Sequence, residues 1–366
     1  MKKIILFYGS FDPIHNGHIK IAKEALNLIK GDKLYFGLNK NSNSKNLTPF
    51  SKRKKMLELA IKNKKKFEIL NIKFDYKNLE DTYDKLFEYC DDDNEYYILV
   101  GQDQLNNLTR WYKFDLIKGK FKFIIASRNN QELVKDSNYL YLENKSYNIS
   151  STDIKNGNYK NINPEVKKYI IENNVYVEYQ LKKYLTPKRL KHVKSVRDLA
   201  LKIYKTNKVG LDKNKIITAT MLHDVAREYS NTKLKNIVKK YYPDRVNELG
   251  YILHQYAGEY IAKKKFYISD ETILEAIRWH TTGSDYMSKL AKLVYVSDKL
   301  DPLRPYDTTP FINACINDLD EGFIEVLKDK LNYSIKKDEV KTMSEATKSA
   351  ISYYLKGEID GVRISY

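Results

Sequence analysis

Two of the six histidines in this 366-residue chain stand three residues apart near its beginning. His15 and His18 follow a short apolar run and a glycine-bearing loop, at the point where a helical pattern begins. Side chains three residues apart on a helix share a face, and the N–H groups at a helix N-terminus attract anions. Imidazoles placed there can donate hydrogen bonds to a phosphate as charge builds up in a transition state. The pair therefore indicates a catalytic phosphate site rather than two ordinary surface histidines.

The other four histidines lie in the second half of the chain, together with two aspartates. These six residues fall among apolar neighbours on expected helices, and we interpret them as metal ligands: His192, His223, Asp224, His254, His280 and Asp298. Polar groups that point into a helical core are costly unless they are paired or bind a metal. A lone inward histidine is usually a satisfied core residue, but six candidates in one helical region predict a metal site. Imidazole and carboxylate donors suit iron, which we expect first, and also manganese or cobalt.

The elements that would position the first site alternate between strands and helices. The expected strands are Ile4–Phe7, Leu34–Leu38, Phe67–Ile72, Tyr96–Val100 and Phe121–Ala126, and the expected helices include 19–29 and 53–62. Short buried runs separated by helices predict an α/β fold, a doubly wound Rossmann-like parallel sheet with helices on both faces. Ligands of such sheets bind at the carboxyl ends of the strands, which is where the loop before His15 lies.

The elements that would position the second site are helices only. Strand patterns stop near Leu190, and the expected helices are 190–204, 215–227, 232–240, 249–264, 271–279 and 289–300. A chain of this length should form about two domains at roughly 150 residues each. The sequence therefore predicts an α/β domain over residues 1–178, a polar linker at 179–188 and an all-helical domain over 189–366.

Composition limits the classes of function. The net charge is +18, but lysine is dispersed along the whole chain, so we expect anionic small substrates and consider nucleic-acid binding unlikely. No stretch reaches the ~18 apolar residues that a membrane helix needs, and we expect no membrane association. Cys90 and Cys315 are far apart and match no metal or disulfide spacing. Free thiols are typical of a reducing compartment, so we expect a cytoplasmic protein.

The segment from Gly9 to His18 resembles the HxGH nucleotidyltransferase superfamily, and within it the bacterial nicotinate mononucleotide adenylyltransferases. Residues 149–155 are similar to the ISSTxIR signature of that family, and residues 101–103 with 110–113 are similar to its mononucleotide-binding segment. The resemblance implies adenylyl transfer from ATP to nicotinate mononucleotide with Mg²⁺. The products would be deamido-NAD and pyrophosphate, which places the reaction in NAD biosynthesis.

The resemblance also implies roles for particular residues. The catalytic residues would be His15, His18 and Lys45. The ATP site would comprise Gly9, Ser10, Phe11, His15, Gly17, His18, Ser150, Ser151, Thr152 and Lys155. The mononucleotide site would comprise Asp81, Thr82, Asp103, Trp111, Lys113 and Arg128. Tyr8 replaces a usual glycine, Lys155 replaces an arginine, and a Ser-Tyr-Thr stretch before the third helix is missing, so the choice between nicotinate and nicotinamide stays open.

The second half resembles the HD superfamily of metal-dependent phosphohydrolases. The phrases that carry the resemblance are residues 223–228, 276–283 and 297–304, and they look closest to the hydrolases that split diadenosine tetraphosphate symmetrically into two ADP. By this resemblance the first metal would be bound by His192, His223, Asp224 and Asp298. His254 and His280 would complete a second metal site, with Asp224 as a bridging catalytic residue. The polyphosphate would contact Arg227, Thr281, Thr282 and Arg304.

Two other interpretations stay open at this point. The helical half could be a different HD nucleotidase that acts on a nucleoside triphosphate or an alarmone. The basic chain could instead be an RNA-binding or regulatory module with degenerate sites, although both sets of motif residues are intact. Neither the oligomeric state nor communication between the domains can be read from the sequence.

Overall fold

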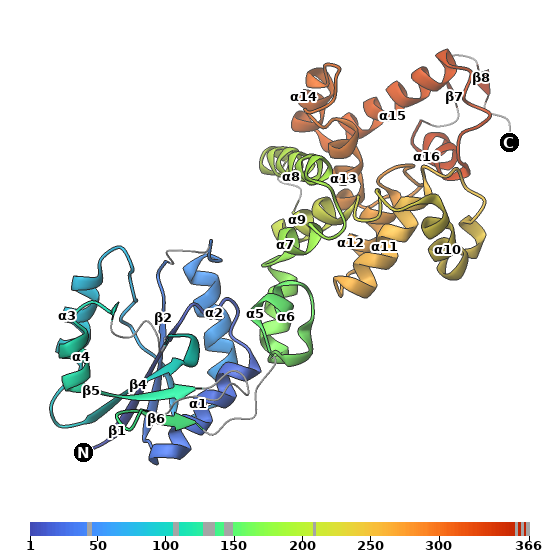
Figure 1. The fold of residues 1–366 in the computed structure, drawn as a ribbon. Coiled ribbons are helices and arrows are strands. Elements are labelled where there is room, and N and C mark those ends of the chain that lie inside the picture. The colour runs from blue at the N-terminus through green and yellow to red at the C-terminus, as the bar shows by residue number, and fades with distance from the viewer. Residues whose placement is uncertain are drawn as a thin grey trace. The chain divides into compact units, whose positions relative to one another are not determined.

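The protein folds as two compact units, Met1–Ile170 and Ile171–Tyr366 (Figure 1). The structure is a computed structural model that describes residues 1–41, 46–104, 110–126, 136–142, 149–207 and 210–355, with the strand residues 358–359 and 362–363. The expected linker, residues 179–188, falls inside the second unit. Leu181 and Leu185 belong to the hydrophobic core of that unit.

The first unit is built on one six-stranded parallel sheet. Its strands are β1 (Lys3–Gly9), β2 (Lys33–Leu38), β3 (Phe67–Ile69), β4 (Glu95–Gly101), β5 (Phe121–Ala126) and β6 (Leu140–Leu142). They lie in the order β3-β2-β1-β4-β5-β6, and every pairing is parallel. The strand order reverses between β1 and β4, so ligands are expected at the carboxyl ends of these two strands. The chain leaves them at Gly9 and Gly101, where two of the predicted motifs begin.

Helices cover both faces of this sheet, which explains why most residues of its strands are apolar. In Figure 1, α1 (Asn16–Ile29) and α2 (Phe50–Ile61) lie on one side of the sheet, and α3 (Leu79–Tyr89) and α4 (Phe114–Lys120) lie on the other. Leu6, Leu86 and Ile117 pack together beneath α3 and α4. The unit closes with α5 (Ser151–Lys155), a short 3₁₀ turn at Tyr159–Asn161 and α6 (Pro164–Glu172). The predicted α/β fold is confirmed.

The second unit is a helical domain, as the sequence predicted. Its helices are α7 (Val177–Leu181), α8 (Pro187–Asn207), α9 (Lys213–Leu222), α10 (Asn231–Tyr241), α11 (Leu253–Lys265), α12 (Glu271–Trp279), α13 (Lys289–Lys299), α14 (Thr309–Asn317), α15 (Leu319–Lys336) and α16 (Glu345–Leu355). A 3₁₀ turn at Pro243–Arg245 precedes α11, and two-residue strands β7 (Glu358–Ile359) and β8 (Val362–Arg363) pair after α16. Helix α13 is central, because it packs against α8, α9, α12 and α15.

One helix end differs from the sequence expectation, and it carries two candidate metal ligands. Helix α9 ends at Leu222 instead of continuing to Arg227, so His223 is its C-cap and Asp224 lies in the following turn. His280 is likewise the C-cap of α12. These residues therefore sit at the ends of helices, where the last carbonyl groups have no partner within the helix. Such free carbonyl groups can accept hydrogen bonds from the imidazole rings.

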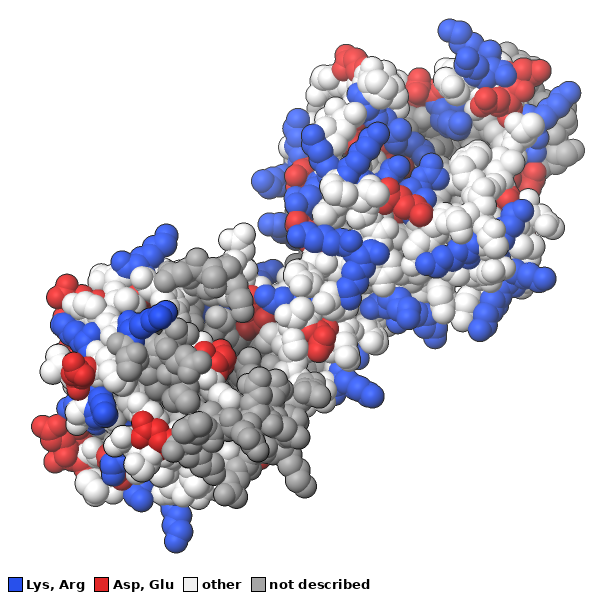
Figure 2. Space-filling view, in the orientation of Figure 1, with Lys and Arg blue, Asp and Glu red and all other residues white. Residues whose placement is uncertain are grey.

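The basic excess is dispersed over the surface. On the face shown in Figure 2, lysine and arginine side chains are scattered over both units among acidic and neutral ones. Such scattering is typical of solvated helix faces rather than of one nucleic-acid groove. Among the described residues, no helix has the length and apolarity required to cross a bilayer.

Candidate active sites

His15 and His18 hold each other at the N-terminus of α1. The backbone N–H of His18 donates to Nδ1 of His15 at 3.4 Å, and the backbone N–H of His15 donates to Nδ1 of His18 at 3.2 Å. The two rings stack with their centroids 3.7 Å apart. Because each Nδ1 accepts a hydrogen bond, a neutral ring must carry its hydrogen on Nε2. Both imidazoles can therefore donate through Nε2 to an anion.

The loop before these histidines is fixed by a buried arginine that the sequence analysis did not single out. Arg53 on α2 is only 1% exposed. Its guanidinium donates to the carbonyl oxygens of Thr48, Ser10 and Asn39, each at 2.8 Å. One side chain thus ties together the loops after β1 and β2 and the start of α2. Arg53 stands in the basic run of residues 52–55, so nothing in the sequence around it distinguished it from its neighbours.

The second predicted ATP-binding segment, residues 149–155, lies beside the same loop. Ser150 caps α5 by accepting from the backbone N–H of Thr152 at 3.0 Å. Ser151 donates its hydroxyl to the carbonyl of Pro13 at 3.0 Å, and Lys155 pairs with the buried Asp12 at 2.6 Å. The fold therefore brings together two motifs that are far apart in the sequence. Lys155 is held in place by Asp12 within this arrangement.

The residues predicted to bind the mononucleotide differ in burial and in their contacts. On α3, Asp81 pairs with Lys85 at the surface. Thr82 is buried and bonded to the backbone, because its hydroxyl donates to the carbonyl of Asn78 at 2.9 Å and accepts from the N–H of Asp75 at 3.2 Å. The contacts of Thr82 make it a residue that shapes the chain before α3.

The other predicted mononucleotide residues follow β4. Asp103 is exposed just beyond Gly101. Trp111 is half-buried and packs against Phe123, with the ring centroids 6.2 Å apart. Lys113 pairs with Asp84 of α3 at 3.4 Å. Lys45 and Arg128 lie outside the described residues.

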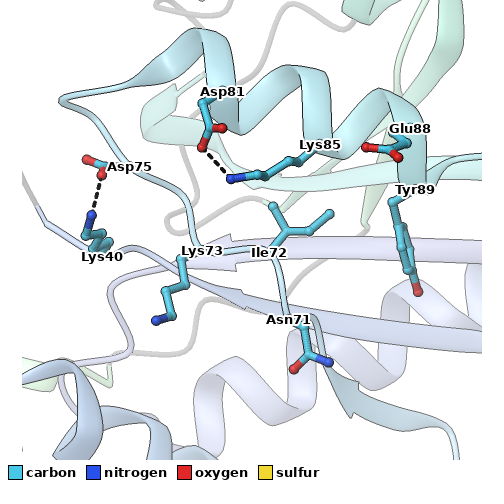
Figure 3. A pocket seen from close by; sticks show the side chains of 9 residues that line it. All are labelled: Lys40, Asn71, Ile72, Lys73, Asp75, Asp81, Lys85, Glu88 and Tyr89. Carbon is cyan, nitrogen blue, oxygen red and sulfur yellow. Dashed lines mark hydrogen bonds and ion pairs between the residues drawn. The ribbon is translucent and has the colours of Figure 1, made fainter.

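One cavity of the first unit lies at the edge of the sheet near α3, with a volume of about 670 Å³ (Figure 3). In Figure 3, Asp81, Lys85 and Tyr89 reach it from α3, and Lys73 reaches it from the segment after β3. Asp81 is the one described member of the predicted mononucleotide set that lines it. The cavity and the loop of His15 and His18 are therefore built from different residues.

Asp224 is the centre of the cluster of candidate metal ligands in the second unit. Its Oδ1 lies 3.2 Å from Nε2 of His254 and 3.5 Å from Nε2 of His280. Its Oδ2 lies 3.5 Å from Nε2 of His192 and 3.7 Å from Nε2 of His223. The two oxygens thus face two different pairs of imidazoles, as a carboxylate that bridges two metals requires.

Asp298 lies nearest the pair of imidazoles on Oδ2 of Asp224, and it also forms a group with His223 and His280. Its Oδ1 lies 3.3 Å from Nε2 of His192 and 3.8 Å from Nε2 of His223. The six side chains form three groups in which all ligand atoms lie within 4.8 Å of one another. The structure therefore brings together every metal ligand that the sequence predicted.

All four imidazoles of the cluster turn Nε2 toward its centre and bind an acceptor through Nδ1. Nδ1 of His223 donates to the carbonyl of Thr220 at 2.7 Å, that of His254 to Tyr251 at 2.6 Å, and that of His280 to Ile277 at 2.8 Å. Nδ1 of His192 instead donates to Oδ2 of Asp301 at 2.6 Å. Since a carbonyl or carboxylate oxygen only accepts, each Nδ1 carries a hydrogen and each neutral ring presents a lone pair at Nε2. This is the tautomer that binds a metal.

The donor set fits cations at the centre of the cluster. Nε2 of His254 and Nε2 of His280 are 3.0 Å apart, where two lone pairs would repel each other without a cation or proton between them. Nε2 of His192 and Nε2 of His223 are buried and have no hydrogen-bond partner within the part of the chain that the structure describes. Buried polar atoms are rarely left unpaired in proteins, so these atoms indicate ligand positions.

Burial and charge set the protonation of these ligands. Burial lowers the pKa of His223 to about 4 and also lowers the pKa of His280. Burial opposes a charge on His192 too, but Asp298 and Asp301 outweigh it and raise its pKa to about 9. Burial also works against a charge on Asp224, whose pKa is nevertheless held well below its usual value by His223 and the other surrounding histidines.

Several predicted polyphosphate ligands border the cluster. Arg227 donates to the carbonyl of Tyr251 at 3.1 Å, and Arg304 donates to the carbonyl of Asp298 at 2.8 Å. The hydroxyl of Thr281 lies 3.0 Å from Nε2 of His280. Thr282 is different, because it is buried and its hydroxyl donates to the carbonyl of Gly283 at 2.8 Å. The structure therefore does not bring Thr282 to the cluster.

Two further residues touch the metal ligands and were missed in the sequence. Arg189, one turn before His192 on α8, donates to Oδ2 of Asp224 at 2.9 Å. Asp301 holds His192, as described above. Asp301 stands in the phrase of residues 297–304 that carries the HD resemblance, and this was the signal for it. Arg189 had no signal beyond its distance of three residues from a histidine.

Over 311 residues the chain is 34% identical to a Mycoplasma genitalium protein named "Probable nicotinate-nucleotide adenylyltransferase/Ap4A hydrolase", a match that covers 83% of this chain and 88% of the relative. The chain belongs to this family. A Mycoplasma pneumoniae protein of the same name is 29% identical, and the match covers 83% of this chain and 90% of that relative. Both units of the chain are therefore shared with other family members.

Each unit also matches a broader family by itself. Residues 6–157 match the family described as cytidylyltransferase-like, and residues 189–303 match the HD domain. Among solved structures, a Clostridium acetobutylicum protein titled "predicted HD superfamily hydrolase involved in NAD metabolism" is 27% identical, with a TM-score of 0.45, and the match covers 50% of this chain and 96% of that one. The HD match covers the segment that holds all six clustered ligands, and this family suggests that they bind divalent metal.

Proposed function

We propose that the chain is a bifunctional enzyme of nucleotide metabolism. The first unit transfers the adenylyl group of ATP to nicotinate mononucleotide and releases deamido-NAD and pyrophosphate. The second unit hydrolyses diadenosine tetraphosphate symmetrically to two ADP. The observation that carries the proposal is that one relative, matched over both units, has a name that joins the two activities, and that each unit has its own polar constellation suited to one of them.

Adenylyl transfer in the first unit requires charge stabilisation rather than a side-chain nucleophile. A phosphate oxygen of the mononucleotide forms a bond to the α-phosphorus of ATP, and the bond from that phosphorus to the bridging oxygen breaks as pyrophosphate leaves. His15 and His18 face the transferred group with Nε2–H donors and with the N-terminus of α1 behind them. Gly9, Ser10, Phe11 and Gly17 let the backbone approach ATP, and Mg²⁺ would neutralise the departing pyrophosphate.

Other segments of the first unit would bind the rest of both substrates. Ser150, Ser151 and Thr152 at the start of α5 and Lys155 at its end would bind the outer phosphates of ATP. Lys45 is proposed as a further catalytic cation. For the mononucleotide, Trp111 offers a flat ring to the pyridine, and the other proposed contacts are Asp81, Thr82, Asp103, Lys113 and Arg128.

Hydrolysis in the second unit would use two metals, for which iron is the first candidate. His192, His223, Asp224 and Asp298 would hold one, and Asp224, His254 and His280 would hold the other. When bound, such metals supply Lewis-acid stabilisation of the phosphoryl charge and activate water. Arg227, Arg304 and Thr281 border the cluster and would bind the polyphosphate. Thr282 would support Thr281 from the core.

The test is to incubate the pure full-length protein with each substrate pair and to separate the nucleotides by chromatography. ATP with nicotinate mononucleotide should give deamido-NAD, and a parallel reaction with nicotinamide mononucleotide measures the preference. Diadenosine tetraphosphate should give ADP as the sole nucleotide product. ATP plus AMP in that reaction, or faster hydrolysis of a nucleoside triphosphate or an alarmone, would reassign the helical unit to another HD nucleotidase.

A further inference from the structure

His192 is held differently from the other three imidazoles of the cluster. His223, His254 and His280 each donate Nδ1–H to the carbonyl of the residue three positions earlier. Those carbonyls lie at helix ends or in turns, where they have no helical partner. His192 lies within the first half of the 21-residue helix α8, whose carbonyls there serve the helix itself. Its Nδ1 therefore needs an acceptor from another part of the chain.

That acceptor is Asp301, just beyond α13, and it is itself held firmly. Oδ2 of Asp301 receives the hydrogen of His192 Nδ1 at 2.6 Å. Oδ1 accepts from the hydroxyl of Ser195 at 2.5 Å and from the backbone N–H of Leu303 at 3.1 Å. Asp301 is only 2% exposed. Both oxygens are thus engaged, and the carboxylate has no freedom to turn away from the imidazole.

We propose that Asp301 is a positioning residue that fixes His192 for one metal and makes the two metal positions inequivalent. The inference rests on the proposed metal pair. A carboxylate behind a ligating histidine fixes the tautomer and orientation of the ring and makes it a stronger ligand. In this chain that support reaches one of the two groups only, because His192 faces Oδ2 of Asp224 together with His223 and Asp298. The rings of His254 and His280, which face Oδ1 of Asp224, are held by backbone carbonyls instead.

The positioning role predicts a selective loss of metal affinity. Removal of the Asp301 carboxylate should weaken the position at His192 by about 10- to 100-fold, the usual effect of losing such a partner. The position at His254 and His280 should keep its affinity. The Asn variant should lose less, because its amide oxygen can still accept from His192 while its NH₂ group faces the Ser195 hydroxyl. Ser195→Ala should have the smallest effect, since the Leu303 N–H still holds the carboxylate.

The experiment titrates Co²⁺ into chelator-stripped full-length protein and counts bound metal by elemental analysis and visible absorption. The variants are Asp301→Ala, Asp301→Asn and Ser195→Ala, with Asp244→Asn as the control for loss of an exposed aspartate in the same unit. Wild type and the control should bind two Co²⁺ in the same two steps, and Asp301→Ala should weaken one of these steps and leave the other unchanged. Adenylyl transfer by the first unit and thermal unfolding check that each variant is folded. If Asp301→Ala does not fold, Asp301→Asn is used for the Co²⁺ titration instead.

The outcomes separate this inference from the proposed function. If wild type binds two Co²⁺ and the Asp301 variants bind both as wild type does, or lose both equally, the positioning role is overturned and the metal pair stands. If wild type binds fewer than two Co²⁺, the proposed metal pair itself is wrong. A drop in hydrolysis without a change in either Co²⁺ affinity also contradicts the inference, because a positioning residue must act through the metal.

Discussion

The tautomers of the histidines separate the two candidate sites chemically. In the first unit, Nδ1 of His15 and of His18 accepts a backbone hydrogen bond, so Nε2 carries a hydrogen and can donate to phosphate. In the second unit, each Nδ1 donates, so Nε2 presents a lone pair to a cation. The same residue type thus serves anion binding in one site and metal binding in the other, and the choice is made by the partner of Nδ1.

At the residue scale, candidate site residues were easiest to find where the residue type is rare. Six histidines in 366 residues stand out by type and spacing alone, and all six lie in the candidate sites. Arg53, Arg189 and Asp301 escaped because the chain has 65 basic and 47 acidic residues. What distinguishes these three is a contact with a distant segment. No local pattern records such a contact for Arg53 and Arg189, and Asp301 stood in a recognised phrase that gave it no role.

His18→Ala should reduce adenylyl transfer about a hundredfold or more, which corresponds to roughly 3 kcal/mol for one lost transition-state donor. The measurement is kcat for deamido-NAD formation. His18→Gln should recover part of the loss, because a glutamine amide can place an N–H near the position of Nε2. Hydrolysis of diadenosine tetraphosphate in the same preparations is the control and should be unchanged. Transfer within a few-fold of wild type in the Ala variant would remove His18 from the reaction.

Trp111→Ala should raise the KM for nicotinate mononucleotide more than the KM for ATP, since only the mononucleotide carries a pyridine ring to stack. The half-buried indole also packs on Phe123, so Trp111→Phe is the matched variant that keeps an aromatic ring. We expect the Phe variant to stay near wild type for both substrates. Equal increases in both KM values would show that Trp111 acts in the core rather than at the mononucleotide.

At the scale of elements, five of the six strands were predicted. Strands such as β5 (Phe121–Ala126) are mostly apolar and are bounded by polar segments, so their limits show in the sequence. The short strand β6 was missed, and β3 ends at Ile69 rather than at Ile72. Helix α9 ends at Leu222, yet apolar periodicity continues through Ala226 because the following turn is also buried. Helices α14 to α16 were not foreseen. Their core contacts are with α8, α13 and one another.

Arg53→Met should destabilise the first unit by about 2–4 kcal/mol, because three buried carbonyls lose a charged donor. The same change should raise the KM for ATP, since the loops after β1 and β2 are no longer tied together. Thermal unfolding with two resolved transitions would measure the first effect, and the transition of the second unit is the internal control. Lys54→Met, an exposed neighbour on the same helix, should leave both values unchanged. Equal effects of the two substitutions would contradict the proposed clamp.

At the scale of the whole molecule, each unit contains its own core and its own polar site. The change from strands to helices in the sequence was sufficient to predict two units. The position of the division was harder to predict, because residues 179–188 look polar and yet supply Leu181 and Leu185 to the second core. Whether a few apolar side chains in a polar stretch are buried depends on the helices that pack over them, which the local sequence does not show.

Asp224→Ala in the full-length chain should abolish hydrolysis and leave adenylyl transfer unchanged. The carboxylate faces all four imidazoles of the cluster, two through each oxygen, so its loss removes a ligand from both metal positions at once. Bound metal, measured by elemental analysis, should fall from two per chain toward none, and Asp224→Asn should also fail because the amide lacks the negative charge that bridging requires. Each variant should make deamido-NAD within about twofold of wild type, since the histidines of that reaction lie in the other unit. Hydrolysis that survives in Asp224→Ala, or that is indifferent to chelators in wild type, would exclude the two-metal mechanism. A parallel loss of adenylyl transfer would instead show that the two units depend on each other.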